Sequence, residues 1–396
     1  MSASAVLRPR ALRAGDLVVV AALSGPLEAA YESDLGLAVG VLERMGFRVR
    51  LAPLLEGGRR HWWSAGRPVE IAEEFNSLLR DPEVRAVVAH DGGQTALGYL
   101  DLIDFDAVVA DPKPILGYSD ISLLHLVLHR RTGLVGFHAD LATPGLGGHW
   151  QRASAPRRVE LEHLYLTLLT STEPVGSLPG GSSWECWRPG RAEGRLIGGV
   201  INRIVLNQAM PYAIPPGRFD GAVLFWEEMG GQAAYVWSYL QVLRHSGILD
   251  RIAGMVVGVP HQIAGLGPSA TPATRAIGGG ETGASAAASG IGRCEPGVSG
   301  GLGVIGGGER GVSGGSRAIG DGGRGVGSRE IGGGAGGHPS LREIVLDVVG
   351  DRDIPILGNV DIGHAGPNLP LPVGVRAALN AGERTLSLLE PAVRAG

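Results

Sequence analysis

The stretch Pro-Ile-Leu-Gly-Tyr-Ser-Asp-Ile-Ser-Leu-Leu-His-Leu-Val-Leu, residues 114–128, decides the fold. Its apolar start, 114–116, predicts a buried strand, and its apolar-rich second half, 121–128, predicts a helix. Between them, Gly117-Tyr118-Ser119-Asp120 predicts a sharp strand-to-helix turn. Such a turn projects the Ser119 hydroxyl out of the sheet, beside helix N-terminal amides that can stabilise an oxyanion. The GxSxG signature is only partly met, and the alternative is a structural cap at the helix start.

The residues before this turn alternate between strand and helix patterns. Apolar runs predict strands at 17–22, 47–51, 84–89 and 115–118, and helical spacing predicts helices at 35–45, 68–79 and 95–102. Repeated strand–helix units predict a doubly wound α/β sheet whose ligands bind at the C-terminal ends of the strands. The turn His90-Asp91-Gly92-Gly93 and Ser119 both fall at such ends, so both are candidates for a binding site.

The second half of the chain is richer in strands and predicts a mixed or barrel-like sheet. The expected strands are 221–226, 253–259, 354–357, 373–378 and 384–389, and the expected helices are 159–169, 233–243 and 341–349. We therefore expect an N-terminal domain at 1–150, a linker rich in Pro, Gly and Ser at 151–190, and a β-rich C-terminal domain at 191–396.

The segment 264–337 differs from everything around it. Glycine dominates it, together with Ser, Ala and Arg, and the tetrapeptide 275–278 recurs at 317–320. Such a composition cannot bury enough apolar surface to offset the entropy lost on ordering. We expect a disordered insertion within the C-terminal domain, and the alternative is a binding tail.

Composition argues against several classes of protein. The net charge of −4 gives no reason to expect a nucleic acid or an anionic membrane surface as partner. Cys186 and Cys294 lie far apart and match no metal spacing, so we expect neither a metal site nor a disulfide framework. No run approaches the length of a membrane span, and residues 1–16 do not lead into a signal peptide. A cytoplasmic protein without metal or organic cofactor is expected.

A reactive serine needs a general base, and that base needs an orienting group. Among the eleven histidines, His364 stands in a glycine-flanked loop between two predicted strands, a setting that suits catalytic placement. The alternative for His364 is a turn histidine that binds its own backbone. His125 and His129 are expected to pack or to face solvent, and His338 closes the glycine-rich segment.

The candidate orienting acid is Glu227, which directly follows an apolar strand. A carboxylate at the end of a buried strand is costly unless it has a partner. Glu228 is expected to face solvent by strand alternation, and the alternative is that both acids merely end the strand. Three tryptophans could line a ligand site or simply pack in the core: Trp184, Trp187 and Trp226.

Together these features resemble the LD-carboxypeptidase family, which includes muramoyl-tetrapeptide carboxypeptidases and microcin C self-immunity proteins. The resemblance covers nearly the whole chain except the glycine-rich insertion. The matching segments, in order, are 15–16 with 24–26, 81–86 with Gly92-Gly93, 111–120, 136–138, 194–199, 224–228, and Gly363-His364 with 371–374.

The resemblance implies a Ser-His-Glu triad: Ser119 as nucleophile, His364 as base and Glu227 as the acid that orients the histidine. It also implies an oxyanion hole made by the backbone amides of Gly93 and Asp120. The implied fold is a Rossmann-like N-terminal domain and a β-rich, barrel-like C-terminal domain, with the site at their interface and the protein a homodimer.

Three positions depart from the family pattern. Asp91 and Gln94 stand where an arginine and a tyrosine are frequent, and Val200 replaces an asparagine. These changes bear on substrate specificity rather than on the triad.

The expected function is a cytoplasmic serine peptidase that removes a C-terminal D-amino acid from a muropeptide by cleaving an L,D-amide bond. The first alternative is an immunity-type hydrolase for peptidyl or aminoacyl nucleotides, with the 184–187 region stacking on an adenine. The second is a non-catalytic module that binds a nucleotide or peptide. The third is an interaction protein that works through its glycine-rich segment.

Overall fold

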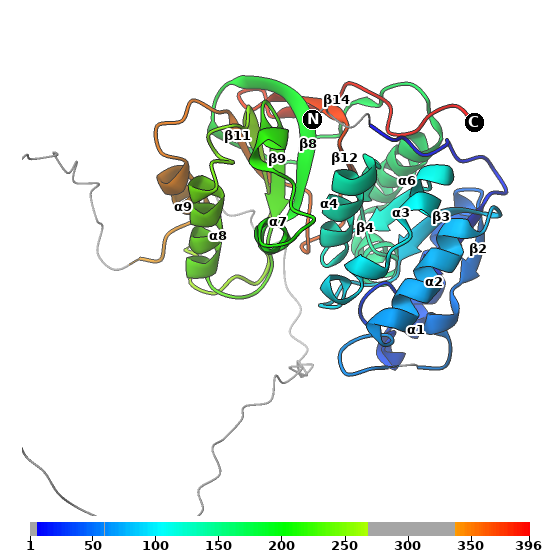
Figure 1. The fold of residues 1–396 in the computed structure, drawn as a ribbon. Helices are drawn as coiled ribbons and strands as arrows, with labels where there is room; N and C mark the ends of the chain where they lie inside the picture. The colour runs from blue at the N-terminus through cyan, green and yellow to red at the C-terminus, as the bar shows by residue number, and fades with distance from the viewer. Residues whose placement is uncertain (1–5, 59, 268–336) are drawn as a thin grey trace, which may run out of the picture. The chain divides into compact units, whose positions relative to one another are not determined.

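Six strands form the first sheet, in the order β12-β5-β4-β3-β1-β2, in which the edge strand β12 is Leu371–Val373. They belong to a computed structural model that describes residues 6–58, 60–267 and 337–396 (Figure 1). Five of the strands are parallel neighbours: β1 (Leu17–Ala21), β2 (Arg48–Leu51), β3 (Val84–Ala89), β4 (Ile115–Gly117) and β5 (Gly136–His138). All five residues of β1 are buried, as expected for a parallel strand covered on both faces.

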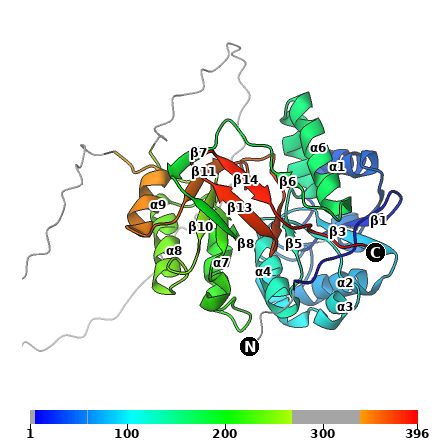
Figure 2. The same cartoon turned by 90° about the horizontal axis from the view of Figure 1, so that it is seen from above.

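Helices cover both faces of this sheet, which confirms the doubly wound arrangement. Figure 2 shows α1 (Glu32–Arg44) and α6 (Ala155–Thr170) on one side of β1 and β3, with α2 (Pro68–Arg80) and α3 (Phe105–Ala110) on the other. The start of α2 follows from sequence, because Pro68 occupies its first turn and Glu70 accepts the backbone N–H of Arg67. The remaining helical segments here are η1 (Ala29–Tyr31), η2 (Pro53–Gly58), η3 (Ala96–Gly98), η4 (Leu100–Leu102), α4 (Ile121–Thr132), η5 (Ala142–His149) and α5 (Trp150–Arg152).

The second sheet has eight strands, in the order β6-β14-β13-β8-β9-β10-β11-β7. Its central part is parallel: β8 (Arg191–Val200), β9 (Val223–Glu227), β10 (Gly254–Gly258) and β11 (Ile356–Val360). The outer strands pair antiparallel: β6 (Gly176–Ser177), β7 (Glu185–Arg188), β13 (Arg376–Asn380) and β14 (Thr385–Leu388). The expectation of a mixed, β-rich second half is confirmed. Its helical segments are α7 (Ile201–Gln208), η6 (Pro216–Phe219), α8 (Ala233–His245) and α9 (Leu341–Val349).

Two predicted elements differ from the structure. The helix expected at 95–102 is only the pair of short 3-10 turns η3 and η4, because the backbone leaves the helical region at Tyr99, where φ is −130° and ψ is 7°. The single strand expected at 373–378 is two strands that belong to different sheets. The chain turns at Gly374, which has φ +94°, so β12 (Leu371–Val373) pairs with β5 of the first sheet and β13 pairs with β8 of the second.

The two sheets meet along α4, the helix that follows Ser119. This helix packs against α7 and β8, and its Leu126 belongs to the apolar core of the second sheet. The C-terminal end of β4 is thereby brought beside the second sheet. The proposed domain boundaries themselves stay a prediction, and most of the predicted glycine-rich insertion, 268–336, lies outside the described residues.

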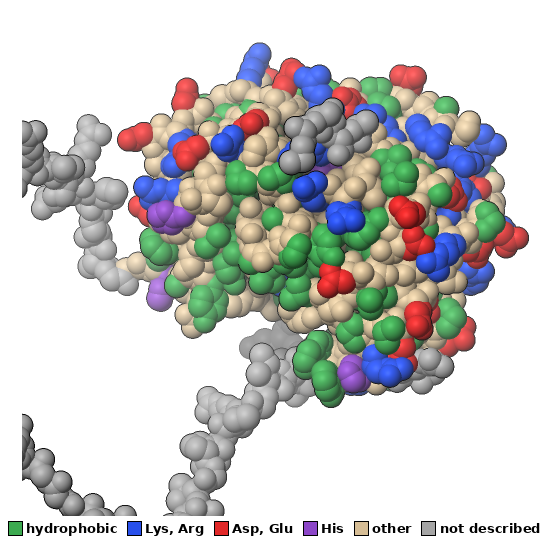
Figure 3. Space-filling view, in the orientation of Figure 1, with side chains coloured by type: hydrophobic (Ala, Val, Ile, Leu, Met, Phe, Trp, Pro, Cys, Tyr) green, Lys and Arg blue, Asp and Glu red, His purple; other side chains and the backbone are tan. Residues whose placement is uncertain are grey.

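Surface and helix properties add two observations. In the part of the chain that the structure describes, no helix is long and apolar enough to cross a membrane. On the face drawn in Figure 3, basic and acidic side chains lie among one another rather than gathered by sign.

Candidate active site

Ser119 lies in a strained turn between β4 and α4. Its φ of +61° is left-handed, a conformation that costs a non-glycine residue about 1–3 kcal/mol. The strain is tolerated because a buried strand and a buried helix fix the chain on both sides of the turn. Such a turn presents the serine side chain at the C-terminal end of the sheet, where ligands of doubly wound folds bind.

The glycine turn after β3 presses directly against this serine. A β-carbon on Gly92 would lie 2.6 Å from both the Cβ and the Oγ atom of Ser119. The turn after β1 closes the group, because the Gly25 amide donates to the Gly92 carbonyl at 2.8 Å. Three strand ends, those of β1, β3 and β4, therefore converge on the Ser119 side chain.

The two amides predicted to form the oxyanion hole belong to these turns. Gly93 has φ +146°, and Asp120 directly follows Ser119. No acceptor among the described residues takes the amide proton of Gly93 or of Asp120. Both protons are therefore available to a ligand, which an oxyanion hole requires.

His364 and Glu227 come from the second sheet and form a hydrogen-bonded pair. The His364 Nδ1 atom lies 2.9 Å from the Glu227 Oε2 atom, and the Glu227 side chain is fully buried at the end of β9. A carboxylate at Nδ1 fixes the ring orientation and leaves Nε2 for proton transfer. The other carboxylate oxygen, Oε1, has no hydrogen-bond partner among the described residues.

Two glycines make room for the Glu227 carboxylate. A β-carbon on Gly363, which has φ +104°, would lie 2.4 Å from Oε2, and one on Gly258 would lie 2.7 Å from the Glu227 Cβ. The glycine before the histidine is thus required for contact with the acid, which the sequence pattern alone did not explain.

The His364 ring, from the second sheet, reaches the turn of the first sheet that carries Ser119. It packs edge-on against the ring of Tyr118, the residue before Ser119, with ring centroids 4.8 Å apart. The structure therefore brings Ser119, His364 and Glu227 into one region although they are distant in sequence. Their catalytic roles remain predictions.

Asp120 stands at the N-cap of α4, but its side chain makes no capping hydrogen bond. The alternative of a structural cap at the helix start therefore does not hold for Asp120. Its carboxylate is buried and turns toward the neighbouring strand ends. The Oδ2 atom accepts from Ser24 Oγ and from the amides of Thr95 and Ala96, each at 2.7 Å. The Oδ1 atom accepts from Arg203 Nε at 2.9 Å.

Sequence reasoning missed Asp140, which anchors the histidine loop. This buried carboxylate follows β5 and accepts hydrogen bonds from the backbone and side-chain N–H groups of Asn368, at 2.9 and 2.6 Å, and from Trp150 Nε1 at 2.7 Å. Burial raises the pKa of Asp140 to about 6. Asp140 stands two residues beyond a short buried strand, which is similar to the signal that singled out Glu227.

Glu228 corrects an expectation, because it is buried and does not face solvent. The chain leaves β9 at Glu227, so strand alternation no longer applies to the next residue. The Glu228 carboxylate instead accepts from the backbone and side chain of Asn202, at 3.2 and 2.9 Å. Burial raises the pKa of Glu228 to about 7, against a usual value of 4.5.

The other candidates fill structural roles. Trp184, Trp187 and Trp226 are all buried in the core, so the stacking role considered for the 184–187 region is wrong. His125 and His129 are also buried, which lowers the pKa of each to about 4.

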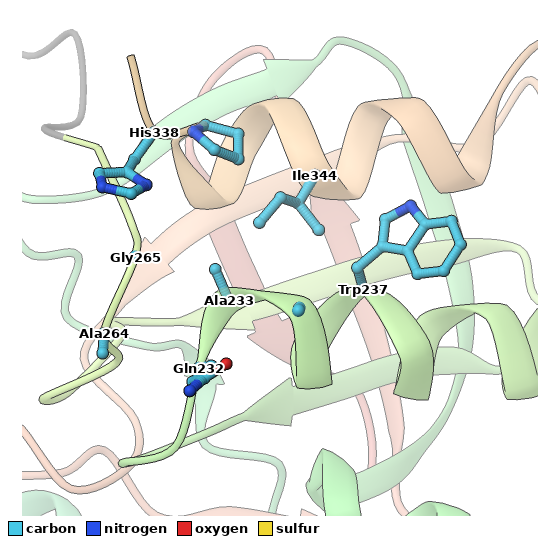
Figure 4. Close-up of a pocket in the computed structure, with 9 residues that line it drawn as sticks. Gln232, Ala233, Trp237, Ala264, Gly265, His338 and Ile344 are labelled. Atoms are coloured by element: carbon cyan, nitrogen blue, oxygen red, sulfur yellow. The ribbon is translucent and has the colours of Figure 1, made fainter. Parts of the chain in front are cut away.

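His338 borders a separate cavity of about 660 Å³ beside α8 and the start of α9 (Figure 4). None of Ser119, Glu227 and His364 lines this cavity. Among the described residues, no cluster of acidic, histidine or cysteine side chains could hold a metal ion.

Comparisons with known proteins agree with the resemblance seen in the motifs. The sequence profile of the LD-carboxypeptidase N-terminal domain matches residues 18–139, and that of the C-terminal domain matches 193–275 and 323–379. A probable murein peptide carboxypeptidase of Bacillus subtilis is 25% identical over 391 residues, 98% of this chain and 96% of the relative. A putative carboxypeptidase of Streptomyces coelicolor is 31% identical over 255 residues, 64% of this chain and 77% of the relative.

A solved structure carries the same fold. It is the microcin C7 self-immunity protein MccF in complex with aspartyl sulfamoyl adenosine. It matches with a TM-score of 0.71 at 20% identity, over 98% of this chain and 99% of that one. Profiles, relatives and fold agree with one another, and the chain belongs to the LD-carboxypeptidase family of peptidases.

Proposed function

We propose that this protein is a serine-type LD-carboxypeptidase that releases the C-terminal D-amino acid of a muropeptide. One observation carries the proposal: the hydrogen-bonded pair His364–Glu227 of the second sheet lies against the turn that presents Ser119. A strained serine, a histidine held by a buried carboxylate and two unpaired amides are the parts that acyl transfer needs. The substrate class is taken from the relatives named as murein peptide carboxypeptidases.

The proposed reaction gives each of these groups one role. The Ser119 Oγ atom attacks the carbonyl carbon of the L,D-amide while His364 Nε2 takes the hydroxyl proton. The negative oxygen that forms is stabilised by the N–H groups of Gly93 and Asp120. Collapse breaks the C–N bond, and the imidazolium gives its proton to the departing amine.

Hydrolysis of the acyl-enzyme then repeats the sequence with water. His364 removes a proton from the water that attacks the ester, and returns it to Ser119 Oγ as the second product leaves. Throughout, Glu227 stabilises the imidazolium and keeps Nδ1 protonated. No other group is needed for the proton balance.

Ser119→Ala tests the assignment. Release of the terminal D-amino acid from a disaccharide tetrapeptide should fall by at least about 10³-fold, while the thermal unfolding temperature stays close to that of the wild type. The matched control is Ser238→Ala, which removes an exposed hydroxyl on α8 and should leave turnover unchanged. Full turnover by Ser119→Ala would eliminate the serine mechanism.

A second candidate is hydrolysis of an aminoacyl nucleotide, and an exposed aromatic pair favours it. Trp62 and Trp63 are 71% and 59% exposed, with ring centroids 5.5 Å apart. Their loop rests on the turn after β1, because the Ala65 amide donates to the Ser24 carbonyl at 3.0 Å. Exposed aromatic rings of this kind can stack on a nucleobase.

A side-by-side assay separates the two candidates. The wild type and the double variant Trp62→Ala/Trp63→Ala would be given the tetrapeptide and aspartyl sulfamoyl adenosine in parallel. Under the carboxypeptidase proposal the tetrapeptide has the higher kcat/KM. A preference for the nucleotide that the double variant loses would favour the second candidate, and turnover of neither substrate would favour a binding module.

The family resemblance is the basis for our expectations about oligomeric state and cellular location. We expect a cytoplasmic homodimer. Light scattering at several protein concentrations should give twice the mass of 41.0 kDa. A stable monomer at all concentrations would contradict the dimer.

A further inference from the structure

Arg203 reaches from α7 of the second sheet into the turns of the first. Its side chain is 8% exposed and makes four hydrogen bonds. The Nε atom donates to Asp120 Oδ1 at 2.9 Å, and Nη2 donates to the Gly93 carbonyl at 3.0 Å and to Gln94 Oε1 at 2.6 Å. The Nη1 atom donates to Asn202 Oδ1 at 3.1 Å.

The two turns that Arg203 contacts are those that carry the amides of the proposed oxyanion hole. Gly93 supplies one amide, and its carbonyl is held by Nη2. Asp120 supplies the other, and its carboxylate is held by Nε. Since the guanidinium group is planar and rigid, two bonds from one group fix the spacing between the two turns.

The Asp120 carboxylate extends this link to the rest of the glycine turn. Its second oxygen holds the amides of Thr95 and Ala96 and the hydroxyl of Ser24. One arginine is therefore connected, directly or through Asp120, to the ends of β1, β3 and β4. Loss of the guanidinium would leave the buried Asp120 charge without its cationic partner.

Neither substrate binding nor stability explains this arrangement well. Four of the five N–H donors of Arg203 are already used within the protein, which leaves little for a substrate carboxylate. A buried ion pair also contributes little net stability, because desolvation offsets its Coulomb attraction. The Arg203–Asp120 pair is better explained by the geometry that it imposes on the turns of Gly93 and Asp120.

We propose that Arg203 is a positioning residue that sets the distance between the Gly93 and Asp120 amides, so that contact between the two sheets completes the oxyanion hole. The inference rests on the proposed function, because the expected loss of kcat presupposes acyl transfer to Ser119. It does not rest on which substrate is cleaved.

The kinetic test compares Arg203→Lys and Arg203→Met with the control Arg195→Met. Arg195 also comes from the second sheet and bonds a carboxylate and a carbonyl, those of Glu390 and Gly374, but it contacts none of the three turns. Both Arg203 variants should lose about 10²-fold in kcat, with KM within about threefold of the wild type. The control should change neither value.

A chemical rescue separates positioning from a merely structural role. Free guanidinium ion at millimolar concentration should restore part of the kcat of Arg203→Ala and should have no effect on the wild type. An unchanged kcat in Arg203→Lys would overturn the proposal. So would a raised KM at constant kcat, because that result would make Arg203 a substrate-binding residue.

A second readout does not depend on activity. Amide hydrogen exchange at Thr95 and Ala96 should become at least about tenfold faster in Arg203→Lys and stay unchanged in Arg195→Met. If the wild type cleaves neither test substrate, the proposed function fails and the exchange result alone decides on Arg203. Unchanged exchange at both amides would then refute the positioning role.

Discussion

The substitution Gly92→Ala would test the packing of the glycine turn against Ser119, the proposed nucleophile. The new β-carbon would lie 2.6 Å from both Ser119 Cβ and Ser119 Oγ, whereas ordinary contacts begin near 3.4 Å. The turn or the serine must therefore shift by about 0.8 Å. A misplacement of about 1 Å costs about 10²-fold in rate, so kcat should fall by roughly that factor.

Stability and activity should separate in this variant. The crowding should cost about 1–3 kcal/mol of unfolding free energy, which leaves the chain folded at room temperature if the wild type has ordinary stability. Release of the D-amino acid at saturating tetrapeptide would give kcat, and thermal unfolding followed by circular dichroism would report the fold.

The control for this experiment is Gly36→Ala in α1. Gly36 is exposed, and its β-carbon would meet no atom within 4 Å, so alanine should keep kcat unchanged and add about 0.5–1 kcal/mol of stability. If a folded Gly92→Ala protein kept the wild-type kcat, the contact between the two turns would not determine the position of Ser119, and the reasoning would be refuted.

Two further predictions concern the acids at the end of β9. In Glu227→Gln the amide no longer favours a proton on His364 Nδ1, so kcat should fall by about 10³–10⁴-fold with little change in thermal stability; a loss under tenfold would contradict the triad. In Glu228→Gln the pH dependence of stability should change. The folded-state pKa of about 7 lies above the unfolded value near 4.5, so the folded wild type holds the extra proton between these values and loses stability as pH rises through them. The variant lacks this loss, and its advantage over the wild type in urea unfolding should grow by up to about 3 kcal/mol between pH 4 and pH 8. Parallel pH profiles for the two proteins would show that Glu228 does not titrate in this range.

Local pattern was sufficient for several elements in both halves of the chain. The strand 84–89 was predicted with the bounds of β3, and the helix 341–349 with those of α9. Both are set by near-neighbour chemistry, namely a continuous apolar run in one case and an apolar face with a Ser340 capping box in the other. The predicted helix 95–102 was wrong because the backbone leaves the helical region at Tyr99, a buried residue whose hydroxyl donates to the distant Leu23 carbonyl.

In the candidate site, too, some features could be predicted from local sequence and others depend on residues distant in sequence. Ser119, Glu227 and His364 could be named as candidates from motifs, because each lies at a strand end or in a glycine loop with a recognisable pattern; their catalytic roles stay predictions. The burial of Glu228 could not be read from sequence, since the chain leaves β9 at Glu227 and Asn202 of α7 supplies the hydrogen bonds to its carboxylate. For Trp184 and Trp187 the sequence left core packing and a ligand wall as alternatives, and their burial decides for core packing.

The amino-acid sequence alone determined the alternation of strands and helices, the turn that carries Ser119 and the membership of the chain in its family, because these depend on residues close together along the chain. Tertiary structure alone decided that the His364–Glu227 pair meets the Tyr118 ring and that Arg203 holds the Gly93 and Asp120 turns. These contacts join residues more than 80 positions apart, and their geometry is set by how α4, α7 and the two sheets pack. Periodicity and capping carry no information on such packing, because it is fixed by the shapes of the faces that meet.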